Sequence, residues 1–435
     1  MYALLDGNNF YVSCERAFQP ALRSRAVVVL SNNDGCVISR SEEAKELGIP
    51  MGMPFFHLRS LQYRSVTALS ANFALYGDMS RRMMQMAATL GPTQEIYSID
   101  ECFIGGLQHI SQLTERAHAL RSRIYQGLGI ACGIGIAPTK TLAKLCNHIA
   151  KQGDRKKKNY PDALTEELAR VCNWQDISRS AQIDLLQATP VGDVWGVGRK
   201  LAPQLLAKGI ATAWDLACQS PVKVRQQWST VLARTVQELQ GIPCMHMEAI
   251  APPAHQVAHT RSFGETVSQL DELLEAVSHF ASQAAAKARA QQLLAGHIYV
   301  FAHTSPQKPL DYWECKGSVP LHPASADTFT IVSAARRVLA HIYQPSHAFM
   351  KAGVVLLDMR SAHLQTQELW DSPNAEASSR LMQAMDLINA QYGPGTLRLA
   401  STGLPHQPRA RWHLRQAMRS PLYTMSYSDL PVASA

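Results

Sequence analysis

The stretch "YSIDECF" at residues 97–103 places two adjacent carboxylates, Asp100 and Glu101, in an apolar segment that predicts a β-strand. Carboxylates are costly to remove from water, so a pair in a strand indicates a nearby cation. A third carboxylate, Asp6, ends the apolar run at residues 2–5, far away in the chain. If the two strands are neighbours in one sheet, the three carboxylates converge at one point.

Converging carboxylates favour Mg²⁺, because this ion prefers oxygen ligands and keeps open positions for phosphate oxygens. Two such ions about 4 Å apart would activate a 3′-hydroxyl and neutralise a leaving pyrophosphate. In the alternative interpretation, Asp6 is a turn or cap residue and Glu101 pairs with a lysine. The carboxylates by themselves leave both interpretations open.

The composition is that of a globular protein of three or four domains, since 46% of the 435 residues are hydrophobic and 17% are charged. The formal net charge of +8 favours a polyanionic partner such as nucleic acid. The nine cysteines are dispersed without a C-x-x-C pair, which is typical of reduced thiols in the cytoplasm. We expect no membrane span and no signal peptide.

Strands and helices alternate through the first part of the chain, which predicts a mixed sheet with helices on one face. The helix expected at 41–54 has Ser41 as its N-cap and Gly48 as its stop signal. The helix at 76–91 carries a methionine stripe that we interpret as core. The remaining expected elements are strands at 25–33 and 130–139 and a helix at 139–151.

The second part of the chain is expected to form a helical region to about residue 243, a linker at 251–260 and a separate α+β module. The strands predicted for this module are "HIYVFAHT" (297–304), "TFTIVSAARRVL" (328–339) and "KAGVVLLDM" (351–359). A further helix is expected at 378–393.

Five blocks occur in a fixed order along the chain. They are "DGNNFYVSCE" (6–15), "SRSEEAKELGIPMGMP" (39–54), "YSIDECF" (97–103), "GIGIAPTKTLAKLCNHIAK" (133–151) and "DVWGVGRKLAPQLLAKGI" (193–210). Together they resemble the Y-family DNA polymerases, and most of all the UmuC-type catalytic subunits of bacterial DNA polymerase V. The resemblance extends to "SPLYT" at residues 420–424.

This resemblance implies an α+β, multidomain, right-hand polymerase fold. Its expected domains are a ferredoxin-like palm (1–22 and 75–165), small fingers (23–74), a helical thumb with a helix-hairpin-helix motif (166–243), an α+β little finger (244–357) and a C-terminal partner-binding region (358–435).

By the same resemblance, Asp6 and Asp100 would bridge two Mg²⁺ ions, and Glu101 would serve the ion that activates the primer terminus. The backbone carbonyl of Gly7 would be a further metal ligand. All three carboxylates that the family uses in catalysis are present in this chain.

The nucleotide-binding residues are also implied by the resemblance. Tyr11 is expected to be the steric gate, whose ring fills the space that a ribose 2′-hydroxyl needs. Lys45 and Lys151 are expected to contact the triphosphate, with Ser39 adding a hydroxyl. The chain departs from many relatives at Glu42, where they carry a phosphate-contacting tyrosine, so we expect that contact to be absent or Glu42 to point away.

Three residues are expected to hold DNA without reading its sequence. Gly196 and Gly198 lie in the turn of the expected helix-hairpin-helix motif, where backbone N–H groups can approach a phosphate. Arg261, in "HTRSFGE" (259–265), is the expected backbone contact of the little finger.

Other site types fit the sequence less well. The segment "GIGIAPTKT" (133–141) is not a P-loop, because Thr139 stands where a glycine must precede Lys140. Cys244, His246, His255 and His259 match no standard zinc spacing. Two other classes of function remain as alternatives, a catalytically silent DNA-binding accessory subunit and a palm-fold nucleotide cyclase.

The function implied is error-prone translesion DNA synthesis in the SOS response, in the bacterial cytoplasm and at the nucleoid. The implied partners are primer-template DNA, dNTPs, a processed UmuD-type dimer, RecA and the sliding clamp. In "QTQELW" (365–370), Gln365, Leu369 and Trp370 form a degenerate clamp-binding peptide, because Thr366 occupies the register of its first glutamine.

Overall fold

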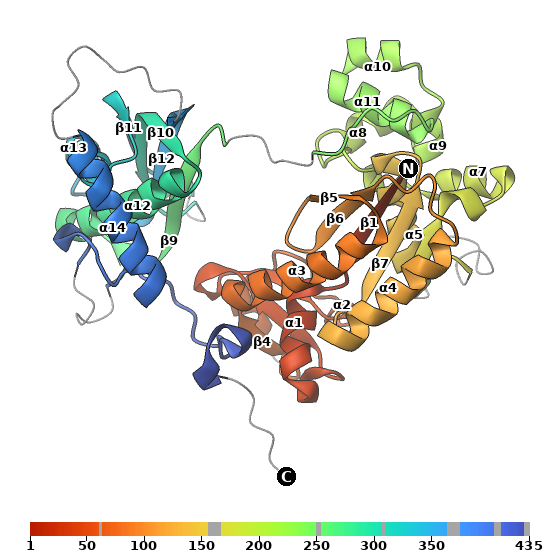
Figure 1. The fold of residues 1–435 in the computed structure, drawn as a ribbon, viewed down its shortest axis with the longest axis horizontal. Coiled ribbons are helices and arrows are strands. Elements are labelled where there is room, and N and C mark those ends of the chain that lie inside the picture. Colours follow the sequence, from red (N-terminus) through yellow and green to blue (C-terminus); the bar gives the residue numbers. More distant parts are fainter. Residues whose placement is uncertain are drawn as a thin grey trace. The chain divides into compact units, whose positions relative to one another are not determined.

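The computed structural model describes residues 1–60, 63–154, 167–248, 254–306, 309–362, 375–403 and 410–429. The chain divides into two compact units (Figure 1). The first consists of Met1–Ser31, Cys36–Ala251 and Met418–Ala435, and the second of Asn32–Gly35 and Pro252–Ala417. Each unit is described by itself below.

The main sheet of the first unit has five strands in the order β5-β6-β1-β7-β8. The central strand β1 pairs antiparallel with β6 and β7, β5 pairs antiparallel with β6, and β8 pairs parallel with β7. The strands are β1 (Tyr2–Gly7), β5 (Thr93–Ile96), β6 (Glu101–Gly105), β7 (Cys132–Ala137) and β8 (Val171–Asn173).

The segment "YSIDECF" is only partly a strand, since β6 begins at Glu101 and residues 97–100 form the bend between β5 and β6. The backbone N–H groups of Tyr97 and Ser98 both donate to the carbonyl of Glu101. The Ser98 side chain also accepts hydrogen bonds from the N–H groups of Asp100 and Glu101. The predicted strand is therefore wrong for Asp100, because local turn hydrogen bonds replace the ladder there.

Helices cover both faces of this sheet, so the predicted single helical face is wrong. On one face, Ala3 and Leu5 of β1 join a core with α1 (Phe10–Phe18), α3 (Phe73–Ala87) and α4 (Leu113–Leu128). On the other face, Leu4 and Phe103 pack with α5 (Lys140–Asp154). Alternate residues of the central strands are apolar on both sides, which requires a cover on each.

Two glycines let α5 lie close to β7. A Cβ atom at Gly135 would collide with the backbone of Ala143 and Asn147, and one at Gly133 would collide with the Asn147 side chain. The glycine-rich strand that superficially resembles a P-loop is therefore explained by helix packing.

A smaller sheet of the first unit has the order β3-β2-β4, with β2 (Val27–Leu30), β3 (Val37–Arg40) and β4 (Thr67–Ser70). The helix α2 (Glu42–Glu46) follows β3. As predicted, the Ser41 side chain caps α2 by accepting a hydrogen bond from the N–H of Ala44. Gly48 then takes φ 74°, which favours glycine and ends the helix.

The helical part of the first unit is tied to α5 through one buried carboxylate. Glu238 accepts hydrogen bonds from the backbone N–H groups of Thr141, Cys244 and Met245. A carboxylate at the first turn of α5 satisfies a free N–H group and complements the helix dipole. The helices of this part are α7 (Arg179–Ala188), α8 (Ala202–Leu206), α9 (Ala213–Ala217), α10 (Pro221–Gln227) and α11 (Thr230–Leu239).

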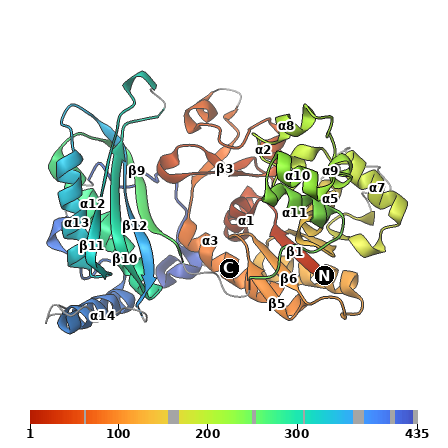
Figure 2. The same cartoon turned by 90° about the horizontal axis from the view of Figure 1, so that it is seen from above.

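The second unit contains an antiparallel sheet in the order β11-β10-β12-β9, with α12 (Leu270–Ala290) and α13 (Thr328–Ile342) on one side (Figure 2). Its strands are β9 (Val257–Val267), β10 (Leu293–His303), β11 (Glu314–Ser325) and β12 (Phe349–Ser361). The predicted strands at 297–304 and 351–359 are confirmed, as is the C-terminal helix, α14 (Ala375–Tyr392).

The strand predicted at 328–339 is wrong, because this segment is α13. Asp327 caps it by accepting a hydrogen bond from the N–H of Thr330. The buried apolar residues follow a helical period and are Ile331, Val332, Ala334, Ala335, Val338 and Leu339. The β-branched residues of the segment suggested a strand, and the tertiary packing outweighs that preference.

No helix in the described residues is long and apolar enough to cross a membrane.

Candidate active site

The carboxylates of Asp6 and Glu101 lie at the same end of neighbouring strands. In the antiparallel pairing of β1 with β6, Asp6 stands opposite Glu101. The backbone N–H of Gly7 donates to the carbonyl of Asp100 at 2.9 Å. The structure thus brings the two sequence blocks that contain these carboxylates together.

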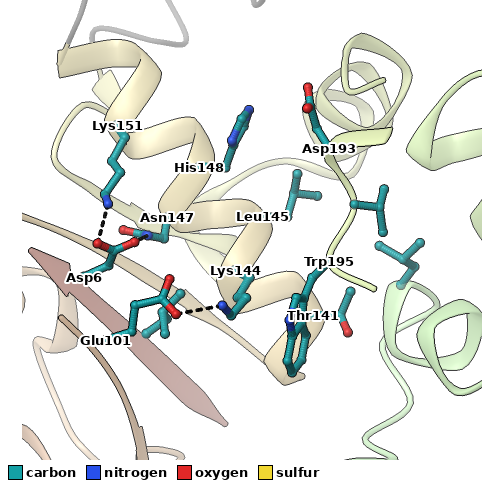
Figure 3. Close-up of a pocket in the computed structure, with 13 residues that line it drawn as sticks. Asp6, Glu101, Thr141, Lys144, Leu145, Asn147, His148, Lys151, Asp193 and Trp195 are labelled. Atoms are coloured by element: carbon teal, nitrogen blue, oxygen red, sulfur yellow. Dashed lines mark hydrogen bonds and ion pairs between the residues drawn. The ribbon is translucent and has the colours of Figure 1, made fainter. Parts of the chain in front are cut away.

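One face of α5 supplies cations and an amide to these carboxylates (Figure 3). Lys151 lies 2.5 Å from Asp6, and the Asn147 amide donates to Asp6 at 3.3 Å. Lys144 lies 2.9 Å from Glu101. The alternative in which Glu101 pairs with a lysine is therefore what the structure contains.

The pKa of Asp6 reflects its largely buried position between Glu101 and Lys151. Burial and the charge of Glu101 raise the pKa of Asp6, while Lys151 lowers it, and the net direction is upward. The Asp100 carboxylate instead accepts a hydrogen bond of 2.6 Å from the hydroxyl of Ser98.

The donor atoms at this site match a hard divalent cation in kind. Asp6 and Glu101 present carboxylate oxygens from paired strand positions. The Asn147 Oδ1 atom, next to Asp6, is buried with no hydrogen-bond partner in the described part of the chain. Among the described residues, however, no three His, Cys, Asp or Glu side chains are gathered closely enough to hold a metal ion.

The carboxylates open into a pocket of about 230 Å³ (Figure 3). Lys144 lies over two rings in this region, 4.4 Å from the centroid of Tyr97 and 5.1 Å from that of Trp195. Lys144 and Asn147 are not among the residues predicted from the sequence motifs. The spacing of positions 144, 147 and 151 could have indicated them, because it places three polar side chains on one face of a helix.

Tyr11 lies in the first turn of α1, within electrostatic reach of Asp100. Its ring stacks on Tyr76 with centroids 4.6 Å apart and meets the edge of Phe73 at 5.9 Å. Burial, followed by the charge of Asp100, raises the pKa of Tyr11. The expected steric gate is thus packed against aromatic rings within electrostatic reach of Asp100.

Lys45 forms an ion pair with Glu42 of α2 and a hydrogen bond with Asn9, the N-cap residue of α1. Its ammonium lies 2.8 Å from the Glu42 carboxylate and donates to Asn9 at 2.6 Å. The Asn9 amide also donates to Glu42. The Glu42 side chain therefore points toward Lys45 and Asn9. Ser39 is only 8% exposed, so little of it is accessible to a nucleotide.

The expected DNA contacts differ in their accessibility. Gly196 takes φ 92°, and a Cβ atom at Gly198 would meet nothing within 4 Å, so this turn is open to a close partner. The guanidinium of Arg261 lies over the rings of Phe280 and Trp412 and is partly buried. The clamp peptide, with Gln365, Leu369 and Trp370, lies outside the described residues.

Comparison with known protein families identifies four matching regions. Residues 5–148 match the impB/mucB/samB family, and residues 254–369 match the C-terminal domain of that family. Residues 179–210 match its HHH motif, and residues 379–433 match a domain of unknown function, DUF4113.

Protein UmuC of Salmonella typhimurium is 41% identical to this chain over 99% of both proteins. The chain belongs to the impB/mucB/samB family. Within this family, protein MucB of Escherichia coli is 37% identical over the full length of both chains. DNA polymerase IV 1 of Bacillus subtilis is 25% identical over 92% of both.

Solved structures confirm the expected fold for this impB/mucB/samB family member. A Y-family DNA polymerase chimera of Dbh and Dpo4 superposes with a TM-score of 0.63 at 17% identity, covering 83% of this chain and 99% of the chimera. A post-insertion binary complex of Dbh DNA polymerase gives a TM-score of 0.54 at 17% identity, over 83% of this chain and 99% of that one. The chain thus has the α+β fold of the Y-family polymerases.

Proposed function

We propose that this chain is an error-prone, DNA-directed DNA polymerase that adds dNTPs to a primer 3′-hydroxyl opposite damaged template. The observation that carries the proposal is the placement of Asp6 opposite Glu101 on paired strands, with the lysines of α5 beside them. Tyr11 lies within electrostatic reach of the adjacent Asp100. Relatives named UmuC and DNA polymerase IV support the same activity.

In this proposal Asp6, Asp100 and Glu101, with the backbone carbonyl of Gly7, hold two Mg²⁺ ions. When bound, the ions supply the charge that activates the primer hydroxyl and offsets the leaving pyrophosphate. Asp6 and Asp100 would supply carboxylate oxygens to the ions, and Glu101 would serve the ion that activates the primer hydroxyl.

The lysines would bind and orient the incoming nucleotide. Lys144 and Lys151 carry their charges on flexible stems, so each can leave its carboxylate and meet a phosphate instead. Lys45 would take a second phosphate, with Ser39 as a minor contact. Tyr11 would exclude a ribonucleotide, because its ring is held between neighbours and cannot move aside without strain.

DNA would be held without sequence preference by the turn at Gly196 and Gly198 and, in the second unit, by Arg261. The proposed division into palm, fingers, thumb, little finger and C-terminal region keeps the bounds given above. A role in the SOS response, at the bacterial nucleoid, follows from the same family resemblance. So do contacts with a UmuD-type dimer, RecA and, through residues 365–370, the sliding clamp.

Primer extension across a template with a single abasic site tests this function. We expect Asp100→Asn to lower dNTP incorporation by about 10²-fold or more, because it removes a charge from the reaction centre. Asparagine preserves the size of the side chain, so the fold should persist. Glu115→Gln, which neutralises an exposed carboxylate at the start of α4, is the matched control and should retain the wild-type rate.

Incorporation by Asp100→Asn equal to that of wild type would contradict the proposed mechanism and favour a silent DNA-binding subunit. Cyclisation of a nucleotide without primer extension would favour the cyclase alternative. Repeating the assay with a UmuD-type partner and a RecA filament tests whether the chain requires them.

A further inference from the structure

Residues 418–429, which we call the return segment, pack against β4, α1 and α3 of the first unit. The backbone N–H of Met418 donates to the Ser70 hydroxyl, and the N–H of Ser70 donates to the Met418 carbonyl, both at 3.0 Å. The ring of Tyr423 stacks on Phe18 of α1 with centroids 4.6 Å apart. The return segment is therefore fixed to its neighbours by both backbone and side-chain contacts.

Ser420 of the return segment reaches a carboxyl group in the core. Glu15 of α1 is completely buried, and one of its oxygens, Oε1, accepts hydrogen bonds from Tyr76 at 2.6 Å and from Ser420 at 3.0 Å. Its other oxygen has no hydrogen-bond partner among the described residues. Burial raises the pKa of Glu15, while these two hydroxyl groups act in the opposite direction.

The position of Ser420 is set by Asn72, the N-cap residue of α3. The Asn72 amide donates to the hydroxyl of Ser420 at 3.0 Å and to the carbonyls of Ser420 and Pro421 at 3.3 and 2.9 Å. All three groups belong to the return segment, so the start of α3 holds the Ser420 hydroxyl toward Glu15.

Tyr76 contacts both Glu15 and Tyr11. Its hydroxyl is held by Glu15, and its fully buried ring stacks on the Tyr11 ring at an interplanar angle of 16°. A buried ring fixed at its hydroxyl end cannot tilt without breaking that hydrogen bond. Tyr11 is therefore supported by a residue whose orientation depends on Glu15.

We propose that Ser420 is a positioning residue for sugar selection: its hydrogen bond to Glu15 fixes Tyr76, which in turn holds the Tyr11 ring in place. The return segment, which lies within the stretch matching a domain of unknown function, is then part of the support of the nucleotide site. This inference rests on the proposed polymerase function, because its consequence is discrimination between deoxyribonucleotides and ribonucleotides.

The test compares kcat/KM for one dNTP and the matching rNTP in the full-length protein. We expect Ser420→Ala to lower the dNTP/rNTP ratio about three- to tenfold, chiefly through improved use of the rNTP, because the loss of one buried hydrogen bond loosens Tyr76. Ser426→Ala removes a hydroxyl whose hydrogen bond within the described residues is to Ser428 of the same segment, and it should stay within about twofold of the wild-type ratio.

Tyr76→Phe provides a second, independent approach, since it removes the other hydroxyl that donates to Glu15 Oε1 but keeps the stacked ring. If the two hydroxyl groups act through one carboxyl, Ser420→Ala and Tyr76→Phe together should lower the ratio less than the product of their separate effects. Thermal unfolding of each variant separates this effect from a general loss of stability.

The outcomes distinguish this inference from the proposed function. A ratio unchanged in Ser420→Ala but collapsed in Tyr11→Ala would overturn the role of Ser420 and leave the polymerase function intact. Equal losses for dNTP and rNTP in Ser420→Ala, with a lower unfolding temperature, would show a role in folding only and also overturn it. A wild-type protein that extends no primer, either alone or with a UmuD-type partner and a RecA filament, would overturn both.

Discussion

Glu42 pairs with Lys45, which we propose as a contact of the incoming triphosphate. The two groups lie 2.8 Å apart, and Asn9 contacts both. Partly exposed ion pairs are worth less than about 1 kcal/mol, so a phosphate can displace Glu42 at a modest cost. The carboxylate should therefore weaken nucleotide binding without abolishing it.

We predict that Glu42→Gln lowers the KM for dNTPs about two- to fivefold, because it frees Lys45 and removes a charge that repels phosphate. Steady-state primer extension measures this change. Glu46→Gln, an exposed carboxylate of the same helix, should leave the KM unchanged. A KM for Glu42→Gln that matches the control would refute this role of Glu42.

At the scale of elements, the approach of α5 to β7 decides the geometry of the candidate site, since α5 carries Lys144, Asn147 and Lys151. Gly135 allows that approach because any Cβ atom there would collide with the backbone of α5. The glycine is thus needed for packing, and the site depends on the packing.

We predict that Gly135→Ala destabilises the protein by about 1–3 kcal/mol or more, through overpacking, and reduces activity as α5 shifts. Gly77→Ala is the control, because a Cβ atom at this helical glycine meets nothing within 4 Å. It should raise the unfolding temperature slightly or leave it unchanged. Both are measured by thermal denaturation, and equal unfolding temperatures for the two variants would exclude overpacking at Gly135.

Some helices and strands were predicted correctly from the sequence, and others were not. Capping and composition were sufficient for α2, with Ser41 as its N-cap, and for the buried methionines of α3. They failed for residues 328–339, where β-branched residues suggested a strand, and for Asp100, which lies in a bend. In both cases, contacts beyond the segment or specific turn hydrogen bonds outweigh local preference.

In the second unit, stability should depend on two partly buried histidines, His259 and His279. Burial, with help from nearby positive charges, lowers the pKa of both His259 and His279 to about 4. The groups that lower the pKa of His259 are Lys287, Arg261 and His279. Those that lower the pKa of His279 are Arg261, His413 and Arg398.

The folded state therefore binds fewer protons than the unfolded state between pH 4 and about 6.5, the ordinary pKa of histidine. The two neutral histidines contribute their full stabilisation above this window, and that contribution is lost as the pH falls through it. We predict a loss of about 1–2 kcal/mol from this pair between pH 7 and pH 5, allowing for partial exposure.

The measurement is the unfolding free energy of the full chain as a function of pH. His279→Gln should flatten the acid side of the curve, because glutamine does not titrate. His341→Gln, at an exposed position in α13, should leave the slope unchanged. Identical slopes for wild type and His279→Gln would contradict this account.

The motifs and their fixed order predicted which kinds of residue the candidate site contains. They pointed to Asp6, Asp100, Glu101 and Tyr11, whose roles stay predictions, and the three carboxylates were expected to converge if two distant strands are neighbours. The structure pairs those strands, but among the described residues it gathers no three such side chains closely enough to hold a metal ion. Only the tertiary structure decided which cations face those carboxylates, and that Ser420 lies beside Glu15, 405 positions earlier. The physical reason is that such contacts join segments far apart in the chain, where neither composition nor periodicity specifies a partner.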